Sequence, residues 1–173
     1  TDDYLISANV LGKYDPYLAW GVVATNYSAA PLAFTFGFST AIMPITGPNA
    51  VYASFAGSVT DIRADGVNVS PNQLDTDGDG AREIATNWLN GTTNAGVDVG
   101  LGYSGPAGGA GHSNSFGPNQ DTKSGPLGTW TSLGTTVGFD LSGNNDIATL
   151  NGYVSVTPIP EPAALLLFGS GLV

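Results

Sequence analysis

Apolar residues alternate with polar ones along much of the chain, at the two-residue period that turns one face of a β-strand toward a core. The clearest case is LAFTFGFST at residues 32–40, where Phe34, Phe36 and Phe38 share one face. Gly, Pro, Asn and Asp separate such segments at short intervals, as turns require. The pattern predicts about eight to ten short strands. We expect them at residues 4–11, 17–25, 32–40, 51–59, 97–103, 130–140 and 147–156, with residues 62–69 extending the strand at 51–59 past a hairpin turn.

The segments between these strands are predicted from their turn residues. Residues 42–48 contain two prolines and a glycine and indicate a connection, and the Gly-, Pro-, Ser- and Asn-rich residues 105–128 indicate a long surface loop. Asp65-Gly66 predicts a hairpin turn, and Ser142-Gly143-Asn144-Asn145 predicts the turn between the last two strands. AREIATNWL, at residues 81–89, is the best candidate for a short helix.

Together these elements predict an all-β fold: an antiparallel β-sandwich, jelly-roll-like, with long loops and at most one short helix. Strands and helices do not alternate along the chain, which disfavours a parallel α/β sheet. The content of 25 glycines and 11 prolines, with only 10% charged residues, suits strands and turns better than helices. We expect one domain at residues 1–157, followed by a proline-rich linker and an apolar segment at residues 158–173.

Charge excludes one class of function. The formal net charge is -10, and the strong cations are Lys13, Arg63, Arg82 and Lys123. Such a chain repels phosphate backbones and cannot assemble a basic patch from four scattered cations, so we expect no nucleic-acid partner. The sequence contains no cysteine, which removes disulfides, thiolate metal sites and cysteine nucleophiles together.

The sharpest local motif is DTDGDGARE, which begins at Asp75. Carboxylates at its positions 1, 3 and 5 and a glycine at position 6 match the first half of a calcium-binding loop. Alternate residues of a tightly curled loop point inward, so these carboxylates converge on one hard cation. The predicted calcium ligands are four carboxylates and one backbone carbonyl: Asp75, Asp77, Asp79, Glu83 and the carbonyl of Ala81.

The motif departs from a complete calcium loop at position 12, where Thr86 stands in place of the usual bidentate glutamate. A carboxylate from elsewhere in the chain would have to complete such a site, and its role would be structural. The alternative is an acidic turn solvated by water, because Asp and Gly are both favoured in turns.

Catalytic constellations are sparse. The single histidine, His112, has Ser113 and Ser115 near it in sequence, but no Gly-X-Ser-X-Gly elbow or phosphate-binding loop occurs. We therefore expect that the protein is not an enzyme, and a secreted hydrolase ranks last among the hypotheses. Among the many aromatic residues, Trp88 and Trp130 would be the first candidates for a sugar-stacking platform.

The chain ends in a segment of unusual composition. Pro160-Glu161-Pro162 is followed by AALLLFGSGLV, eleven mostly apolar residues. A membrane-spanning helix needs ~20 apolar residues, so this run is about half of one.

These terminal residues resemble the sorting signal of PEP-CTERM proteins, in which Pro-Glu-Pro precedes a hydrophobic stretch and a short basic tail. The second half of the stretch and the basic tail are missing from this sequence. The resemblance implies a protein exported by an exopolysaccharide-producing Gram-negative bacterium, with a precursor that is transiently membrane-associated and is read by an exosortase. It covers about the last fifteen to thirty residues and says little about the remaining fold.

The sequence therefore predicts a secreted structural protein of the bacterial cell surface or biofilm matrix. We expect it to form a homo-oligomer or homopolymer through a terminal segment, residues 4–11 or the apolar tail, with a filament as one form of the assembly. The alternative is a surface carbohydrate-binding module with a structural calcium loop, whose partner would be an extracellular polysaccharide.

Overall fold

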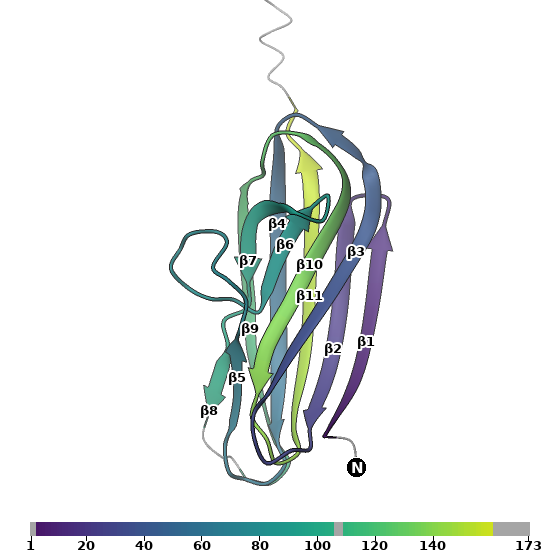
Figure 1. Cartoon of the computed structure of the whole chain (residues 1–173). Helices are drawn as coiled ribbons and strands as arrows, with labels where there is room; N and C mark the ends of the chain where they lie inside the picture. The colour runs from purple at the N-terminus through teal and green to yellow at the C-terminus, as the bar shows by residue number, and fades with distance from the viewer. Residues whose placement is uncertain (1–2, 106–108, 161–173) are drawn as a thin grey trace, which may run out of the picture.

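The computed structural model describes residues 3–105 and 109–160, and these residues form eleven β-strands and no helix. Antiparallel pairing joins the strands into two sheets that lie face to face (Figure 1). The predicted all-β antiparallel sandwich is thus confirmed. Within these two ranges, no helix exists that could cross a membrane.

The first sheet contains five strands in the order β1-β2-β11-β4-β9, so that β1 and β9 are its two edges. Their bounds are β1 (Tyr4–Lys13), β2 (Tyr17–Asn26), β11 (Asp146–Pro158), β4 (Asn49–Asp61) and β9 (His112–Ser124). The predicted domain boundary after residue 157 falls at the end of β11, and residues 161–173, which hold most of the predicted terminal segment, lie outside the described part of the chain.

The second sheet is built around β10, which pairs with β3 along one side and with β6 and β5 in succession along the other. β7 then extends the sheet beyond β6, and β8 extends it beyond β5. The bounds are β3 (Leu32–Thr46), β5 (Val67–Pro71), β6 (Ala85–Leu89), β7 (Thr93–Val99), β8 (Tyr103–Gly105) and β10 (Thr129–Leu141).

The core lies between the two sheets and is formed by the alternating apolar residues that the sequence pattern indicated. Val51, Ala53 and Phe55 on β4 are buried at every second position, as a strand with one inward face requires. From the other sheet, Phe139 on β10 is fully buried and stacks on Phe34, with ring centroids 5.4 Å apart.

Two predicted elements are wrong. Residues 81–89 are not a helix: residues 85–89 form β6, which pairs with both β10 and β7 and is almost entirely buried. β6 reads ATNWL, and a short segment buried on both faces lacks the two-residue alternation that would distinguish a strand from a buried helix. Residues 105–128 are not a long loop, because β9 occupies residues 112–124. Its sequence is polar because β9 is an edge strand, exposed at most positions.

Three connections also differ from expectation. β3 continues through most of residues 42–48, where a register shift in its pairing with β10 between Trp130 and Ser132 marks an irregularity. The turn at Asp65-Gly66 is not a hairpin, since β4 and β5, which flank it, belong to different sheets. The strand predicted at 97–103 is two strands, β7 and β8, separated at residues 100–102.

Candidate metal centre and a free sheet edge

The acidic motif forms the tip of the loop between β5 and β6, which projects from the side of the molecule where β7 and β9 lie (Figure 1). Asp75 shapes this loop: its Oδ1 accepts a hydrogen bond from the Gly78 N–H (2.7 Å) and its Oδ2 accepts one from the Gly80 N–H (2.9 Å). Gly78 and Gly80 have positive φ angles of 83° and 91°, a conformation that favours glycine. The loop is therefore curled by its own Asp and Gly residues.

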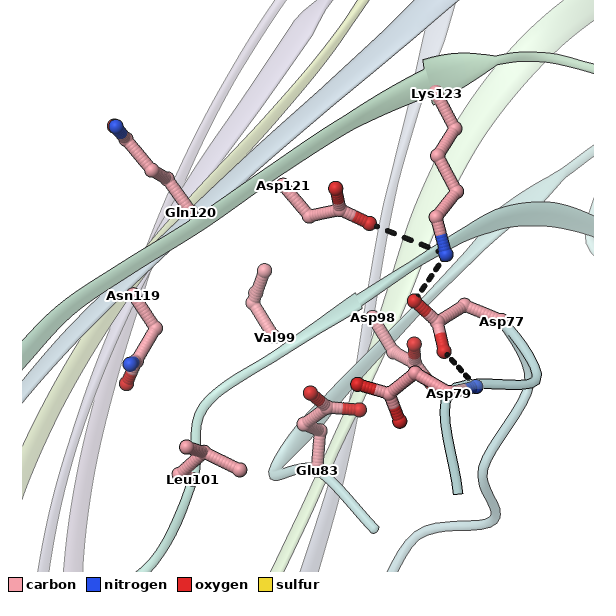
Figure 2. A pocket seen from close by; sticks show the side chains of 10 residues that line it. All are labelled: Asp77, Asp79, Glu83, Asp98, Val99, Leu101, Asn119, Gln120, Asp121 and Lys123. Atoms are coloured by element: carbon pink, nitrogen blue, oxygen red, sulfur yellow. Dashed lines mark hydrogen bonds and ion pairs between the residues drawn. The ribbon is translucent and has the colours of Figure 1, made fainter. Parts of the chain in front are cut away.

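Three carboxylates converge beneath the loop. Asp77, Glu83 and Asp98 each offer an oxygen, and these oxygens lie within 4.8 Å of one another. Figure 2 shows the side chains pointing toward one another, with Asp79 beside them. Glu83 is 7% exposed and Asp98 is 2% exposed, and within the described residues neither Glu83 Oε2 nor Asp98 Oδ1 has a hydrogen-bond partner.

Strand pairing brings Asp98 to this place from outside the motif. Asp98 lies on β7 directly opposite Thr86 on β6, so the two side chains are cross-strand neighbours. Thr76 fixes the Asp98 carboxylate, donating from its N–H (2.8 Å) and its hydroxyl (3.1 Å) to Oδ2. Both hydrogen bonds use the same oxygen, which leaves Oδ1 free to face the other carboxylates.

The backbone after Glu83 is held equally firmly. The Ile84 N–H donates to the Gly100 carbonyl (2.9 Å), and the Ile84 carbonyl accepts from the Gly138 N–H (2.7 Å). Ile84 itself is fully buried. Because Ile84 is anchored to the second sheet, the position of the adjacent Glu83 is fixed by that sheet as well as by the acidic loop.

β9 closes the other side of the cluster. Lys123 donates a hydrogen bond to Asp77 Oδ2 and forms a longer ion pair with Asp121, at 3.5 Å (Figure 2). A pocket of about 410 Å³ lies between the loop, β7 and β9. Its lining holds five carboxylates and one ammonium, a net charge of −4 if all are ionised: Asp77, Asp79, Glu83, Asp98, Asp121 and Lys123.

The electrostatics of the pocket follow from burial and like charge. Burial raises the pKa of Glu83 to about 8, and the carboxylates of Asp98, Asp79 and Asp77 add to the effect. Burial also raises the pKa of Asp98, against the hydrogen bonds from Thr76. For Asp77 burial opposes ionisation, but the Lys123 hydrogen bond and the Asp79 N–H outweigh it and hold the pKa below its ordinary value. Burial and the repulsion between like charges therefore oppose ionisation of Glu83 and Asp98.

A second acidic group lies where the β4–β5 and β10–β11 turns meet, but local hydrogen bonds account for most of its oxygens. Asp61 accepts from the N–H groups of Arg63, Ala64 and Gly66. Asp146 accepts from the Ser142 hydroxyl at Oδ2, although its Oδ1 has no partner within the described residues. The group therefore stabilises the two turns.

The structure divides the predicted calcium ligands into two sets. The carboxylates of Asp75, Asp77 and Asp79 do converge, as the motif predicted. Glu83, however, groups with Asp77 and Asp98, and neither Asp75 nor Ala81 lines the pocket. Asp98 was not predicted from the sequence. This residue reaches the cluster through the pairing of β6 with β7, which the local motif cannot predict. The signal that something was missing was Thr86 at position 12.

The other residues considered for function lie apart from this cluster. His112 begins β9 and is exposed, and the Ser113 hydroxyl hydrogen-bonds to Thr60 (2.7 Å). Adjacent residues of a strand face opposite sides, so the His112 and Ser113 side chains diverge. Trp130 is a core residue, 7% exposed, and Trp88 is half-buried with its Nε1 donating to the Thr136 hydroxyl (3.1 Å). A sugar-stacking platform built on these two tryptophans is therefore not supported.

The opposite edge of the first sheet is apolar and bare. All ten residues of β1 are exposed, and in the described part of the chain β1 pairs with β2 alone. Tyr4 is 53% exposed, Leu5 59%, Val10 53% and Leu11 57%. A groove of about 250 Å³ separates the start of β1 from β3, and Tyr4 contacts Phe34 edge-on across it, with ring centroids 6.0 Å apart.

Comparison with known proteins identifies no family for this chain. No family model matches the chain, and no curated protein matches it. A structure of the infectious bursal disease virus Gx strain is similar at 16% identity and a TM-score of 0.37, over 90% of this chain and 32% of the viral one. The VP2 subviral particle of the same virus gives 14% identity and a TM-score of 0.21, over 99% and 44%. The chain thus spans less than half the length of either viral chain.

Proposed function

We propose that this protein is a structural component of the bacterial cell surface or extracellular matrix, and that its copies associate through the free edge of β1. The observation that carries the proposal is a ten-residue edge strand that is exposed along its length, with four large apolar side chains more than half exposed: Tyr4, Leu5, Val10 and Leu11. An edge of this kind is a template for another strand. The place outside the cell is supported by the resemblance of residues 160–173 to an export-sorting signal; residues 161–173 lie outside the described part of the chain.

The register of β1 tells which of its backbone groups face outward. The Tyr27 N–H donates to the Asp3 carbonyl (2.8 Å), and residue 3 would therefore start the series of positions bonded to β2. Because these positions alternate in an antiparallel pair, the N–H and C=O groups of Ile6, Ala8 and Val10 point to the free edge. A strand from a second copy would satisfy these groups and cover apolar side chains at the same time.

The sequence of β1 contains no feature that would prevent such pairing. Edge strands that stay unpaired usually carry prolines, inward charges or bulges. β1 has no proline, its one charge is Lys13 at its last position, and its pairing with β2 is regular over all ten residues. A second copy is the partner we propose, because the free edge and the apolar side chains need only another strand of similar character. Two β1 strands pairing with each other would close a dimer, whereas β1 pairing with a different segment would continue as a filament.

The test is sedimentation velocity over a range of protein concentrations, with electron microscopy of the same samples. Ala8→Pro removes an outward N–H without touching the β1–β2 ladder, and edge strands tolerate proline at such positions. We expect the unchanged chain to associate with rising concentration and Ala8→Pro to remain monomeric with its melting temperature nearly unchanged. Ala8→Val keeps the N–H and is the matched control, expected to associate. Association that is equal in Ala8→Pro and Ala8→Val would contradict the proposal.

A further inference from the structure

The pocket between the acidic loop, β7 and β9 contains two polar atoms that nothing in the described chain satisfies. Glu83 Oε2 and Asp98 Oδ1 are buried, lack hydrogen-bond partners and belong to carboxylates that are more than nine-tenths buried. Both side chains are directed into the cluster with Asp77 (Figure 2). Buried, unpaired carboxylate oxygens carry a high desolvation cost, which a bound cation removes.

We propose that Asp77, Glu83 and Asp98 bind one calcium ion, with Asp79 completing its coordination at the mouth of the pocket. The donors are all carboxylate oxygens, which a hard cation prefers over the softer transition metals. Calcium accepts six to eight oxygens in irregular geometry, whereas magnesium requires a near-ideal octahedron. Asp77 lies on the loop, Glu83 just before β6 and Asp98 on β7. Ligands from three such separate segments are better suited to calcium, because calcium tolerates irregular geometry.

Lys123 does not account for the cluster. Its ammonium contacts Asp77 and Asp121, so it neutralises the β9 side of the pocket. It leaves Glu83 Oε2 and Asp98 Oδ1 without a partner. Lys123 acts as a partial counter-ion that a calcium ion would displace from Asp77, and Asp121 would then hold the ammonium on β9.

The proposed site differs from the calcium loop that the motif alone describes. In that loop Asp75 would be a ligand at position 1, but here both Asp75 oxygens accept hydrogen bonds from loop N–H groups. The missing carboxylate of position 12 is supplied instead by Asp98, across the strand pair from Thr86. The ion would therefore join the loop to the second sheet, and its structural effect would be to fix the loop against β7 and β9.

The experiment is isothermal titration calorimetry of calcium into the full chain after treatment with a chelating resin. Asp98→Asn and Glu83→Gln each remove a proposed ligand charge and should weaken calcium binding roughly tenfold or more. Asp75→Asn keeps one oxygen that can accept one of the two loop hydrogen bonds and removes no proposed ligand, so it should change the affinity by less than about threefold. A larger loss in Asp75→Asn than in Asp98→Asn would overturn the inner site in favour of the loop, and absence of binding by the unchanged chain would overturn both.

A variant on β9 keeps the test decisive if the buried substitutions do not fold. Lys123 is 38% exposed at its side chain, so Lys123→Met should leave the fold intact. Because it removes the competing ammonium, it should strengthen calcium binding severalfold. Unchanged or weaker binding in Lys123→Met would contradict displacement of Lys123 by the ion. The association of copies through β1 is measured separately, so either proposal can fail without the other.

Discussion

The two edge strands of the first sheet, β1 and β9, both have one side with no neighbouring strand, but they differ in the residues they carry there. β9 is polar, contains Pro118, has a register shift in its pairing and carries Asp121 and Lys123 against the acidic loop. β1, at the other margin of the sandwich (Figure 1), has none of these features and exposes apolar side chains along its length. The comparison teaches that one edge carries polar and charged residues, a proline and an irregular register, which disfavour pairing with another strand, whereas the other edge carries none of these.

The two sides of the core also differ in what stabilises them. Near β1 and β3 the packing is aromatic: Phe139 stacks on Phe34 and on Phe36, with centroids 5.4 and 6.3 Å apart. Near β9 aromatic packing continues, with Phe116 against Phe55 and Tyr103, but the carboxylate pocket lies beside it. The aromatic side should therefore be insensitive to pH and calcium, and the acidic side should depend on both.

The largest expected effect comes from a substitution in the aromatic part of the core. Phe139→Ala removes a fully buried ring and should lower the free energy of unfolding by about 3–5 kcal/mol. The loss should be the same with and without calcium, because the ring stacks on Phe34 and Phe36 and does not line the carboxylate pocket. Chemical denaturation in both conditions measures it, and a loss that depends on calcium would show that the two sides are not independent.

The next effect is a pH dependence of the free energy of unfolding in the absence of calcium, which arises from the carboxylate pocket. The Glu83 pKa is raised to about 8, so between about pH 4.5 and 8 the folded state keeps a proton that the unfolded state releases. The free energy of unfolding should therefore fall by several kcal/mol as the pH rises through this window, because each unit of pKa difference corresponds to about 1.4 kcal/mol. The raised pKa of Asp98 acts in the same direction, whereas the lowered pKa of Asp77 contributes stability that is lost only in more acidic solution.

The matched variant for this dependence is Glu83→Gln, which cannot release the proton. Its stability should vary much less between pH 5 and 8 than that of the unchanged chain, as followed by urea denaturation without calcium. Equal slopes for the two proteins would assign the pH dependence to other groups.

Calcium itself should have a somewhat smaller effect. At a free concentration of about 100 times the dissociation constant, a ligand that binds the folded state stabilises it by about 2.7 kcal/mol. For a chain of this size that corresponds to a rise in melting temperature of about 5–10 °C. Differential scanning calorimetry with calcium and with chelator measures the rise, which at the same calcium concentration should fall by about half or more in Asp98→Asn and persist in Asp75→Asn.

The smallest effect compares the two edges directly. Leu11→Lys places a charge on β1 and Thr122→Lys places one on β9, both at exposed positions. Each should change the free energy of unfolding by less than about 0.5 kcal/mol. Leu11→Lys should weaken association of the copies and Thr122→Lys should not, as measured by sedimentation; the reverse order would exchange the roles of the two edges.

The sequence predicted those parts of the fold that have one buried and one exposed face. The alternation at residues 32–40 and 51–59 located β3 and β4. A half-buried strand places apolar residues on its buried face and polar residues on its exposed face, so the two types alternate along the sequence. β9 could not be found this way, since Phe116 is its one large apolar side chain and its position comes from hydrogen bonds to β4. β6 was mistaken for a helix for the opposite reason, because it is buried nearly throughout.

The candidate site was predictable to the same extent. Of the five predicted ligands, Asp77, Asp79 and Glu83 line the pocket, and the fixed spacing of a calcium loop along the chain is what indicated them. Asp98 was not predicted, since it reaches the cluster only through the pairing of β6 with β7. Lys123 and Asp121 were hidden in a segment predicted to be a loop. Local spacing therefore revealed the part of the site that lies on one segment, and tertiary structure supplied the rest.

Amide hydrogen exchange, resolved by residue with NMR, tests the difference between the two edges most directly. We predict that raising the protein concentration slows exchange at the outward-facing amides of Ile6, Ala8 and Val10 and leaves the loop at 72–84 unchanged. Adding calcium should slow exchange in that loop and leave β1 unchanged. If concentration protects β9 instead of β1, or if the β1 amides are equally protected at every concentration, the assignment of a closed edge and an open edge is wrong.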